Sequence, residues 1–69
     1  MDFKKIIGNR IKKERTSRGL NRDDLASMAE LHVNLIGRIE RGVTNTGYEN
    51  MHRICKALNI SLCELYKGY

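Results

Sequence analysis

The chain has 69 residues, of which 41% are hydrophobic and 30% charged, and it contains no proline. This length can bury one small hydrophobic core and is too short for two, so we expect residues 1–69 to form a single domain. The formal net charge is +5, and eight of the thirteen basic residues fall within residues 1–22. Such a concentration is typical of a surface that meets phosphates or anionic lipid, although a solvated basic helix is the simpler alternative.

Several classes of protein are excluded by what the sequence lacks. No stretch reaches the roughly 18 apolar residues of a membrane span, and residues 1–10 have no apolar core of a secretion signal, so we expect a cytoplasmic protein without membrane contact. Cys55 and Cys63 are too few for a disulfide framework, and with His52 they match no zinc-site spacing. Because no phosphate loop and no nucleophile beside a base are present, we predict neither an enzyme nor a cofactor, metal or small-molecule ligand.

The spacing of apolar residues predicts an all-α fold of five short helices, because no segment alternates like a half-buried strand. The first helix is expected over residues 2–17, where Phe3, Ile7 and Ile11 recur at helical spacing and Gly19 is placed to end it.

The second and third predicted helices are both short. The second spans about residues 21–30, with Asn21 as its N-cap, because the side chain can accept from the backbone N–H three residues later. The third spans about residues 32–41 and buries Ile36 and Ile39.

The last two helices are each predicted from a capping box. Thr46 and Glu49 have the spacing of such a box, and apolar residues repeat behind it at Tyr48, Met51, Ile54, Cys55 and Leu58. Ser61 and Glu64 repeat the pattern and start a helix of one to two turns, with apolar Leu62, Leu65 and Tyr66.

The second and third helices have the layout of a helix-turn-helix, since about three residues separate them. Many other all-α domains contain such a pair, so the layout alone does not indicate DNA binding. More specific are the order and spacing of four segments: Ile7-Gly8-Asn9-Arg10-Ile11, residues 19–26, Ile36-Gly37-Arg38-Ile39-Glu40-Arg41-Gly42, and residues 51–65. Together they resemble the Cro/C1-type (XRE) family of helix-turn-helix transcriptional regulators over nearly the whole chain.

The resemblance implies a compact five-helix, lambda-repressor-like domain that reads a palindromic DNA operator as a dimer. The size is similar to that of short stand-alone regulators, including the controller proteins of restriction–modification systems. The alternative is a protein-interaction module of the same fold, as in partners of toxins, with little DNA specificity. A basic first helix lying on a membrane is disfavoured because it lacks tryptophan and a broad apolar face.

The family's base-reading positions fall at the start of the third helix and one turn further on. Arg38 has the donor fork suited to guanine, Asn34 can pair with adenine, and Val33 can touch a thymine methyl. Gly37 on the same face would let the DNA approach the helix backbone. The full set implied by the resemblance is His32, Val33, Asn34, Gly37 and Arg38, and the alternative for each is a solvated surface position.

Phosphate contacts need donors at the rim of the groove. Asn21 and Arg22 would combine side-chain donors with the free N–H groups and dipole of the second helix, although Arg22 could instead form a salt bridge with neighbouring acids. The other candidates are Arg10, Arg41, Thr44 and Asn45.

Arg15 and Glu40 fall on positions that family members use for an ion pair between the first helix and the Glu-Arg-Gly segment, so we expect a structural pair there rather than two unpaired surface charges. Three positions depart from the family: Arg22 replaces a usual Gln, Glu30 a usual Gly in the turn, and His32 a usual Ser or Thr cap. Glu30 must therefore tolerate or avoid positive φ at a modest cost.

A homodimer is expected because one such domain offers DNA only a small interface. Its surface is predicted at the end of the chain, where apolar residues exceed what a chain of this size readily buries: Ile60, Leu62, Leu65, Tyr66 and Tyr69.

Overall fold

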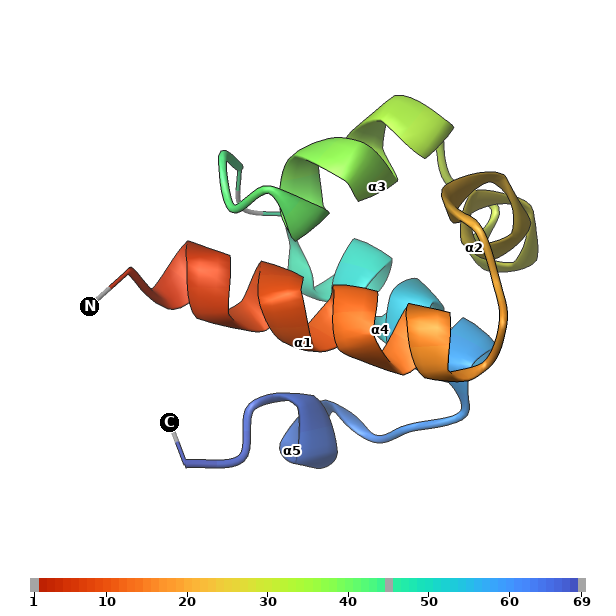
Figure 1. The fold of residues 1–69 in the computed structure, drawn as a ribbon. Coiled ribbons are helices and arrows are strands. Elements are labelled where there is room, and N and C mark those ends of the chain that lie inside the picture. The colour runs from red at the N-terminus through yellow and green to blue at the C-terminus, as the bar shows by residue number, and fades with distance from the viewer. Residues whose placement is uncertain (1, 45, 69) are drawn as a thin grey trace.

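The computed structural model describes residues 2–44 and 46–68, and over these residues it contains five α-helices and no strand. In chain order they are α1 (Phe3–Ser17), α2 (Arg22–Ala29), α3 (Val33–Glu40), α4 (Tyr48–Leu58) and α5 (Leu62–Leu65). Figure 1 shows α1 crossing the middle of the molecule, with α3 above it and α5 below it. The expected all-α fold of five helices is confirmed.

One hydrophobic cluster joins all five helices. The helix pairs that pack most extensively are α2 with α4, α1 with α3, and α2 with α3. The side chains with no exposed surface are Ile11, Leu25, Ile36, Ile54 and Leu58. Phe3 differs from the rest of the apolar stripe on α1, because it is 44% exposed and stacks on Tyr66 with ring centroids 5.7 Å apart.

The backbones of α1 and α3 approach each other closely at Gly8, which is buried. A Cβ atom on Gly8 would lie 2.9 Å from the carbonyl oxygen of Glu40 and closer still to that of Ile39. Only glycine permits this contact without moving one helix, so Gly8 sets the distance between α1 and the end of α3.

Three helix starts are capped by side chains. The Asp2 side chain accepts from the N–H of Lys4 at α1, and complete capping boxes form between Asn21 and Asp24 at α2 and between Ser61 and Glu64 at α5. These two boxes stabilise the helix starts that the sequence predicts.

The capping box predicted for α4 is wrong. The N-cap is Gly47, which has no side chain to cap with, and the Thr46 hydroxyl accepts instead from the side-chain amide of Asn50 at 2.8 Å. Thr46 and Glu49 have the right spacing, but the helix begins one residue later than that spacing requires.

The turn between α2 and α3 is closed by Glu30 in the left-handed conformation, with φ of 58°. The Leu31 N–H donates back to the Ala26 carbonyl at 2.9 Å, which satisfies one of the last carbonyls of α2. Glu30 therefore accepts a strained backbone where glycine is favoured. His32 follows as the N-cap of α3 and makes no side-chain capping bond.

A search of the described residues finds no helix with the length and apolar character that crossing a membrane requires.

Candidate nucleic-acid interface

The exposed side of α3 and the start of α2 form one shallow hollow on the protein surface. It is lined by Arg22, Val33, Asn34, Gly37, Arg38 and Arg41. Four of the five candidate base-reading residues and two of the candidate phosphate contacts are thus brought together. His32 is exposed at the N-cap of α3, next to this group in the chain.

The two sides of α3 differ because of how the helix packs. Ile36 and Ile39 are buried in the core, whereas Asn34 and Arg38 are exposed. The apolar residues therefore hold α3 with its polar side facing solvent.

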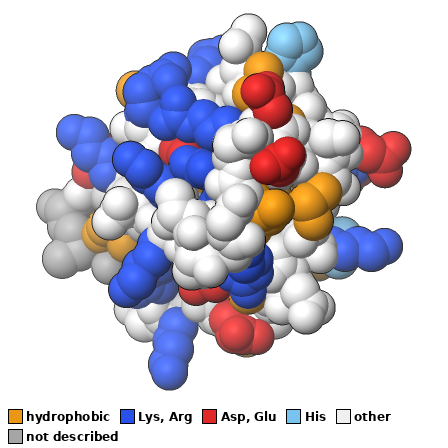
Figure 2. Space-filling view, turned by 45° about the vertical axis from the view of Figure 1, so that its right-hand side comes forward, with side chains coloured by type: hydrophobic (Ala, Val, Ile, Leu, Met, Phe, Trp, Pro, Cys, Tyr) orange, Lys and Arg blue, Asp and Glu red, His pale blue; other side chains and the backbone are white. Residues whose placement is uncertain are grey.

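The hollow is strongly basic, because three arginines and no acidic residue line it. In the upper part of the face drawn in Figure 2, Lys and Arg side chains gather on the left and Asp and Glu side chains lie mainly on the right. Guanidinium groups on one surface attract phosphates and lower the free energy of a bound anion.

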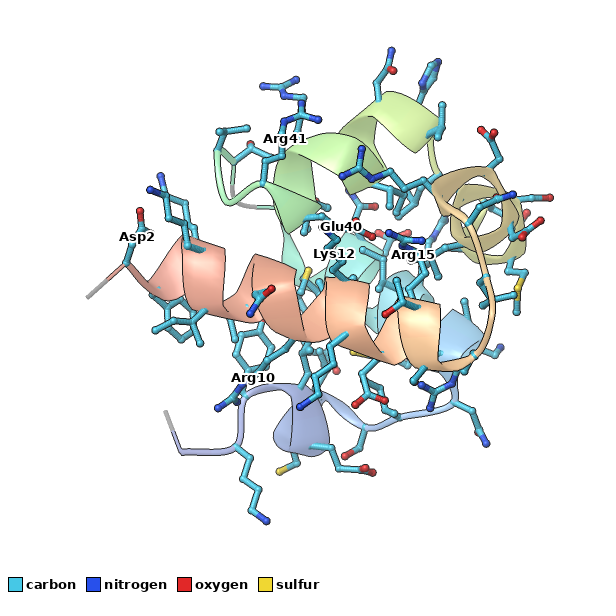
Figure 3. The ribbon with its side chains drawn as sticks, in the orientation of Figure 1. Asp2, Arg10, Lys12, Arg15, Glu40 and Arg41 are labelled. Carbon is cyan, nitrogen blue, oxygen red and sulfur yellow. The ribbon has the colours of Figure 1, made fainter. Side chains whose placement is uncertain are left out.

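Behind the hollow, Arg15 and Glu40 form a buried ion pair between α1 and α3. Arg15 Nε donates to Glu40 Oε2 at 2.6 Å and Nη2 donates to Oε1 at 3.1 Å, while Nη1 donates to the Leu20 carbonyl at 2.8 Å. The hydrogen bond to Glu40 raises the pKa of Arg15, against burial, which lowers it, and with a further contribution from the Glu40 charge. Figure 3 shows the two side chains meeting between the helices.

Glu40 has a second arginine partner that the sequence analysis did not find. Arg22 Nε donates to Glu40 Oε1 at 3.1 Å, and the Arg22 side chain is 39% exposed. The expected alternative was a salt bridge between Arg22 and acids near it in the chain, but its acidic partner lies 18 residues away on α3. No local pattern signals such a pair.

Gly37 does not offer the open backbone that its base-reading assignment requires. It is buried, and a Cβ atom there would lie 3.2 Å from Arg41 Nη1 and 3.6 Å from Arg22 Nη1. Two guanidinium groups therefore cover this point of α3. The glycine makes room for arginine side chains in this structure, and they occupy the space through which DNA was expected to approach.

The start of α2 also has fewer free donors than expected from the sequence. The Asn21 side-chain oxygen accepts from the Asp24 N–H at 2.7 Å, and the Asp24 carboxylate accepts from the Asn21 N–H at 3.0 Å. The capping box thus occupies two N–H groups and places an acidic side chain at the helix start. The Arg22 side chain, which is 39% exposed, is the more accessible donor at this end.

Comparison with known proteins identifies the family. Residues 11–65 match the sequence pattern of the family described as Helix-turn-helix. The chain belongs to this helix-turn-helix family. It is 32% identical over 65 residues to Control protein C.SmaI of Serratia marcescens, and the match covers 94% of this chain and 77% of that relative.

Solved structures agree with this helix-turn-helix assignment. The restriction-modification controller protein C.AhdI from Aeromonas hydrophila is similar with a TM-score of 0.89 and 32% identity, covering 91% of this chain and 96% of that chain. The wild-type restriction-modification controller protein C.Esp1396I gives a TM-score of 0.84 and 28% identity, covering 93% and 83%. The chain is a sequence-specific DNA-binding regulator of transcription, and the expected resemblance to the XRE family is confirmed.

In this helix-turn-helix domain, Arg10 lies away from the motif formed by α2 and α3. Its Nη1 donates to the carbonyls of Leu65 at 3.0 Å and Lys67 at 2.7 Å. Figure 3 shows Arg10 extending from α1 toward α5, on the side opposite Arg41. The structure gives Arg10 a role in holding the end of α5, in place of the phosphate contact expected from the sequence. Thr44 is partly buried, and Asn45 lies outside the described residues.

One residue of the predicted dimer surface is buried within the domain. Leu65 is only 2% exposed, because it packs into the core from α5, so it is unavailable to a partner chain. Ile60, Leu62 and Tyr66 are partly buried against the core and keep some exposed surface. Tyr69 lies outside the described residues.

The cysteines and His52 have ordinary environments. Cys55 is buried, and burial raises the pKa of its thiol to about 11. Cys63 is exposed, and His52 stacks on Tyr48 with ring centroids 6.2 Å apart. Among the described residues, no three His, Cys, Asp or Glu side chains gather closely enough to hold a metal ion.

Proposed function

We propose that this helix-turn-helix regulator places α3 in the major groove of duplex DNA. The observation that carries the proposal is the exposure of Asn34 and Arg38 on one side of α3, within a basic hollow that Arg22 and Arg41 border. Arg38 then donates to a guanine edge and Asn34 pairs with adenine, while Val33 and His32 lie at the start of the helix near neighbouring bases.

Phosphate contacts flank this helix. Arg22 at the start of α2 and Arg41 at the end of α3 contribute charged donors, and the side-chain amide of Asn21 adds a neutral one. Thr44 and Asn45 follow α3 in the chain and contact the DNA backbone beyond the phosphate that Arg41 contacts. These contacts fix the position of the domain without reading sequence, whereas Asn34 and Arg38 supply specificity.

The regulator acts as a homodimer on a palindromic operator, with half-sites about 34–36 Å apart. Ile60, Leu62 and Tyr66 supply part of the dimer surface, together with Tyr69. Two of the similar proteins are restriction-modification controller proteins. We therefore infer that this single-domain chain controls restriction-modification genes in the cytoplasm, and that it does so by binding DNA without catalysis.

In-vitro selection from random duplexes tests this function. The full chain should enrich a palindrome, and sedimentation of the complex should give two chains for each selected duplex. If no sequence is enriched and the chain binds random duplexes only weakly, the fold serves another purpose, such as pairing with a protein.

A further inference from the structure

Glu40 binds two arginines that engage it to different extents. All three nitrogens of Arg15 are engaged, because Nε and Nη2 donate to Glu40 and Nη1 donates to the Leu20 carbonyl. Within the described residues, Arg22 donates through Nε alone, to Glu40 Oε1 at 3.1 Å. One carboxylate therefore anchors a buried structural arginine and an arginine that reaches the surface.

The terminal amino groups of Arg22 are available for a ligand. Within residues 2–44 and 46–68, no acceptor is recorded for its Nη1 or Nη2. The Arg22 side chain is 39% exposed, whereas that of Glu40 is 1% exposed, so Arg22 extends from a buried carboxylate to the surface. A guanidinium held through Nε presents its two amino groups in a plane, which is the arrangement that pairs with two oxygens of one phosphate.

Arg41 approaches the same point of the surface. Its Nη1 lies 3.2 Å from the position that a Cβ atom would take on Gly37, and Arg22 Nη1 lies 3.6 Å from it. Glu40 carries one negative charge and pairs with two positively charged groups, Arg15 and Arg22. With Arg41 included, this group of three arginines and Glu40 keeps two uncompensated positive charges. An anion bound over Gly37 relieves that repulsion.

We propose that Glu40 is a positioning residue for DNA binding: it holds Arg22 beside Arg41 over Gly37, so that both guanidinium groups grip one backbone phosphate. This inference rests on the proposed function, in which Arg22 and Arg41 border the major-groove helix. It adds that the buried ion pair between α1 and α3 also orders a contact at the DNA surface, and that Gly37 is required as the floor of the phosphate site.

Replacing Glu40 distinguishes positioning from simple charge. Removing a carboxylate near DNA should strengthen binding if only electrostatic repulsion changes, because phosphates repel acidic groups. If Glu40 positions Arg22, replacing Glu40 should instead weaken binding. In Glu40→Gln we expect binding to a selected duplex to weaken by about tenfold, because Arg22 then loses its charge-assisted anchor. Circular dichroism and thermal unfolding establish which fraction is folded under the assay conditions.

A double-mutant cycle assigns the effect to Arg22. Arg22→Ala should weaken all duplexes alike and reduce the salt slope of log K by about one. Adding Glu40→Gln to Arg22→Ala should cause no further loss, because the side chain that Glu40 positions is absent. Equal losses from Glu40→Gln in both backgrounds would show that Glu40 acts on DNA binding by another route and would overturn the proposal.

Two further variants test the proposal if Glu40→Gln does not fold. Arg22→Lys keeps the charge on a surface side chain but cannot be held at one edge while offering two amino groups, so we expect about fivefold weaker binding with little change in salt slope. Gly37→Ala favours the helix and introduces a methyl group 3.2 Å from Arg41 Nη1, so it should also weaken binding. If both variants bind like the wild type, the phosphate site is wrong.

The controls separate this inference from the proposed function. If the wild type enriches no duplex, the function itself fails. If the wild type binds a selected duplex and Arg38→Ala binds it weakly, while Arg22→Lys, Gly37→Ala and folded Glu40→Gln bind normally, only the inference fails. If Arg22→Ala relaxes specificity at one base pair and leaves other duplexes unaffected, Arg22 reads a base, which also overturns the phosphate assignment.

Discussion

Arg15 and Glu40 join α1 to α3 through two hydrogen bonds, and their side chains are only 10% and 1% exposed. The pair lies beside Leu20, whose carbonyl accepts from Arg15 Nη1. Because each charge is withdrawn from water, each depends on its partner for compensation. The contact therefore fixes how the two helices meet more than it adds net stability.

Arg15→Met should destabilise the protein severely. It leaves the Glu40 carboxylate buried with Arg22 as its one recorded partner, which costs about 3–5 kcal/mol of the free energy of unfolding. Urea denaturation measures this loss. Arg18→Met is the matched control, since it breaks an exposed pair with Glu14 and should cost less than about 1 kcal/mol. Similar losses in the two variants would contradict the structural role assigned to Arg15.

Gly8→Ala should destabilise the protein although alanine favours helices. The added methyl group would meet the carbonyl oxygens of Ile39 and Glu40, so α1 and α3 must separate at a cost of about 1–3 kcal/mol. Asn9→Ala is the control in the same helix, because Asn9 is exposed and its replacement should change stability by less than about 0.5 kcal/mol. A Gly8→Ala variant as stable as the wild type would show that the helices do not touch there.

Local signals in the sequence predict the helices well. Ser61 with Glu64 forms the expected capping box, and Asn21 is the expected N-cap of α2, where the Asp24 side chain completes a box as well. The expected conformational cost at Glu30 is also present, since its φ is 58°. Thr46 fails as a cap because α4 begins one residue later, with Gly47 as its N-cap, and spacing alone does not reveal that shift.

Contacts between helices are harder to infer from one sequence. Arg10 reaches carbonyls 55 and 57 residues away, and Arg22 reaches an acid 18 residues away. The family resemblance pointed to Arg15 with Glu40, but no periodicity connects Glu40 to Arg22. The surroundings of Gly37 likewise depend on the positions of the Arg22 and Arg41 side chains, which both lie against it. The sequence thus places the candidate site on α3, whereas the partners behind it become visible only in the packed structure.

The two cysteines should differ in reactivity and in their effect on stability at high pH. At pH 8 a thiol reagent should modify exposed Cys63 quickly and Cys55 only as the protein unfolds. Burial raises the pKa of Cys55 from 9.0 to about 11, so the folded state favours the neutral thiol. Its stabilising contribution is complete below pH 9 and is lost as the pH rises through about 11, because the unfolded chain releases the proton earlier.

Unfolding experiments between pH 8 and 11 can isolate this contribution. In a Cys63→Ser background, the free energy of unfolding should fall more steeply with pH than in Cys63→Ser with Cys55→Ala, because the two proteins differ only in the Cys55 thiol. Parallel curves, or rapid labelling of Cys55 in the folded protein, would show that its thiol is accessible to solvent.

Arg38→Ala should weaken binding to a selected operator by about 1–3 kcal/mol and relax the preference at one base pair of each half-site. The reason is that Arg38 is exposed on α3 and its guanidinium can donate to two acceptors of one guanine. A mobility shift with the operator and its single-base variants measures both effects. Lys56→Ala removes an equal charge from the exposed side of α4 and should leave the base preference unchanged. If the two variants lose affinity equally for every sequence, Arg38 contributes charge alone, and the reading of bases must be assigned to Asn34 and its neighbours at the start of α3.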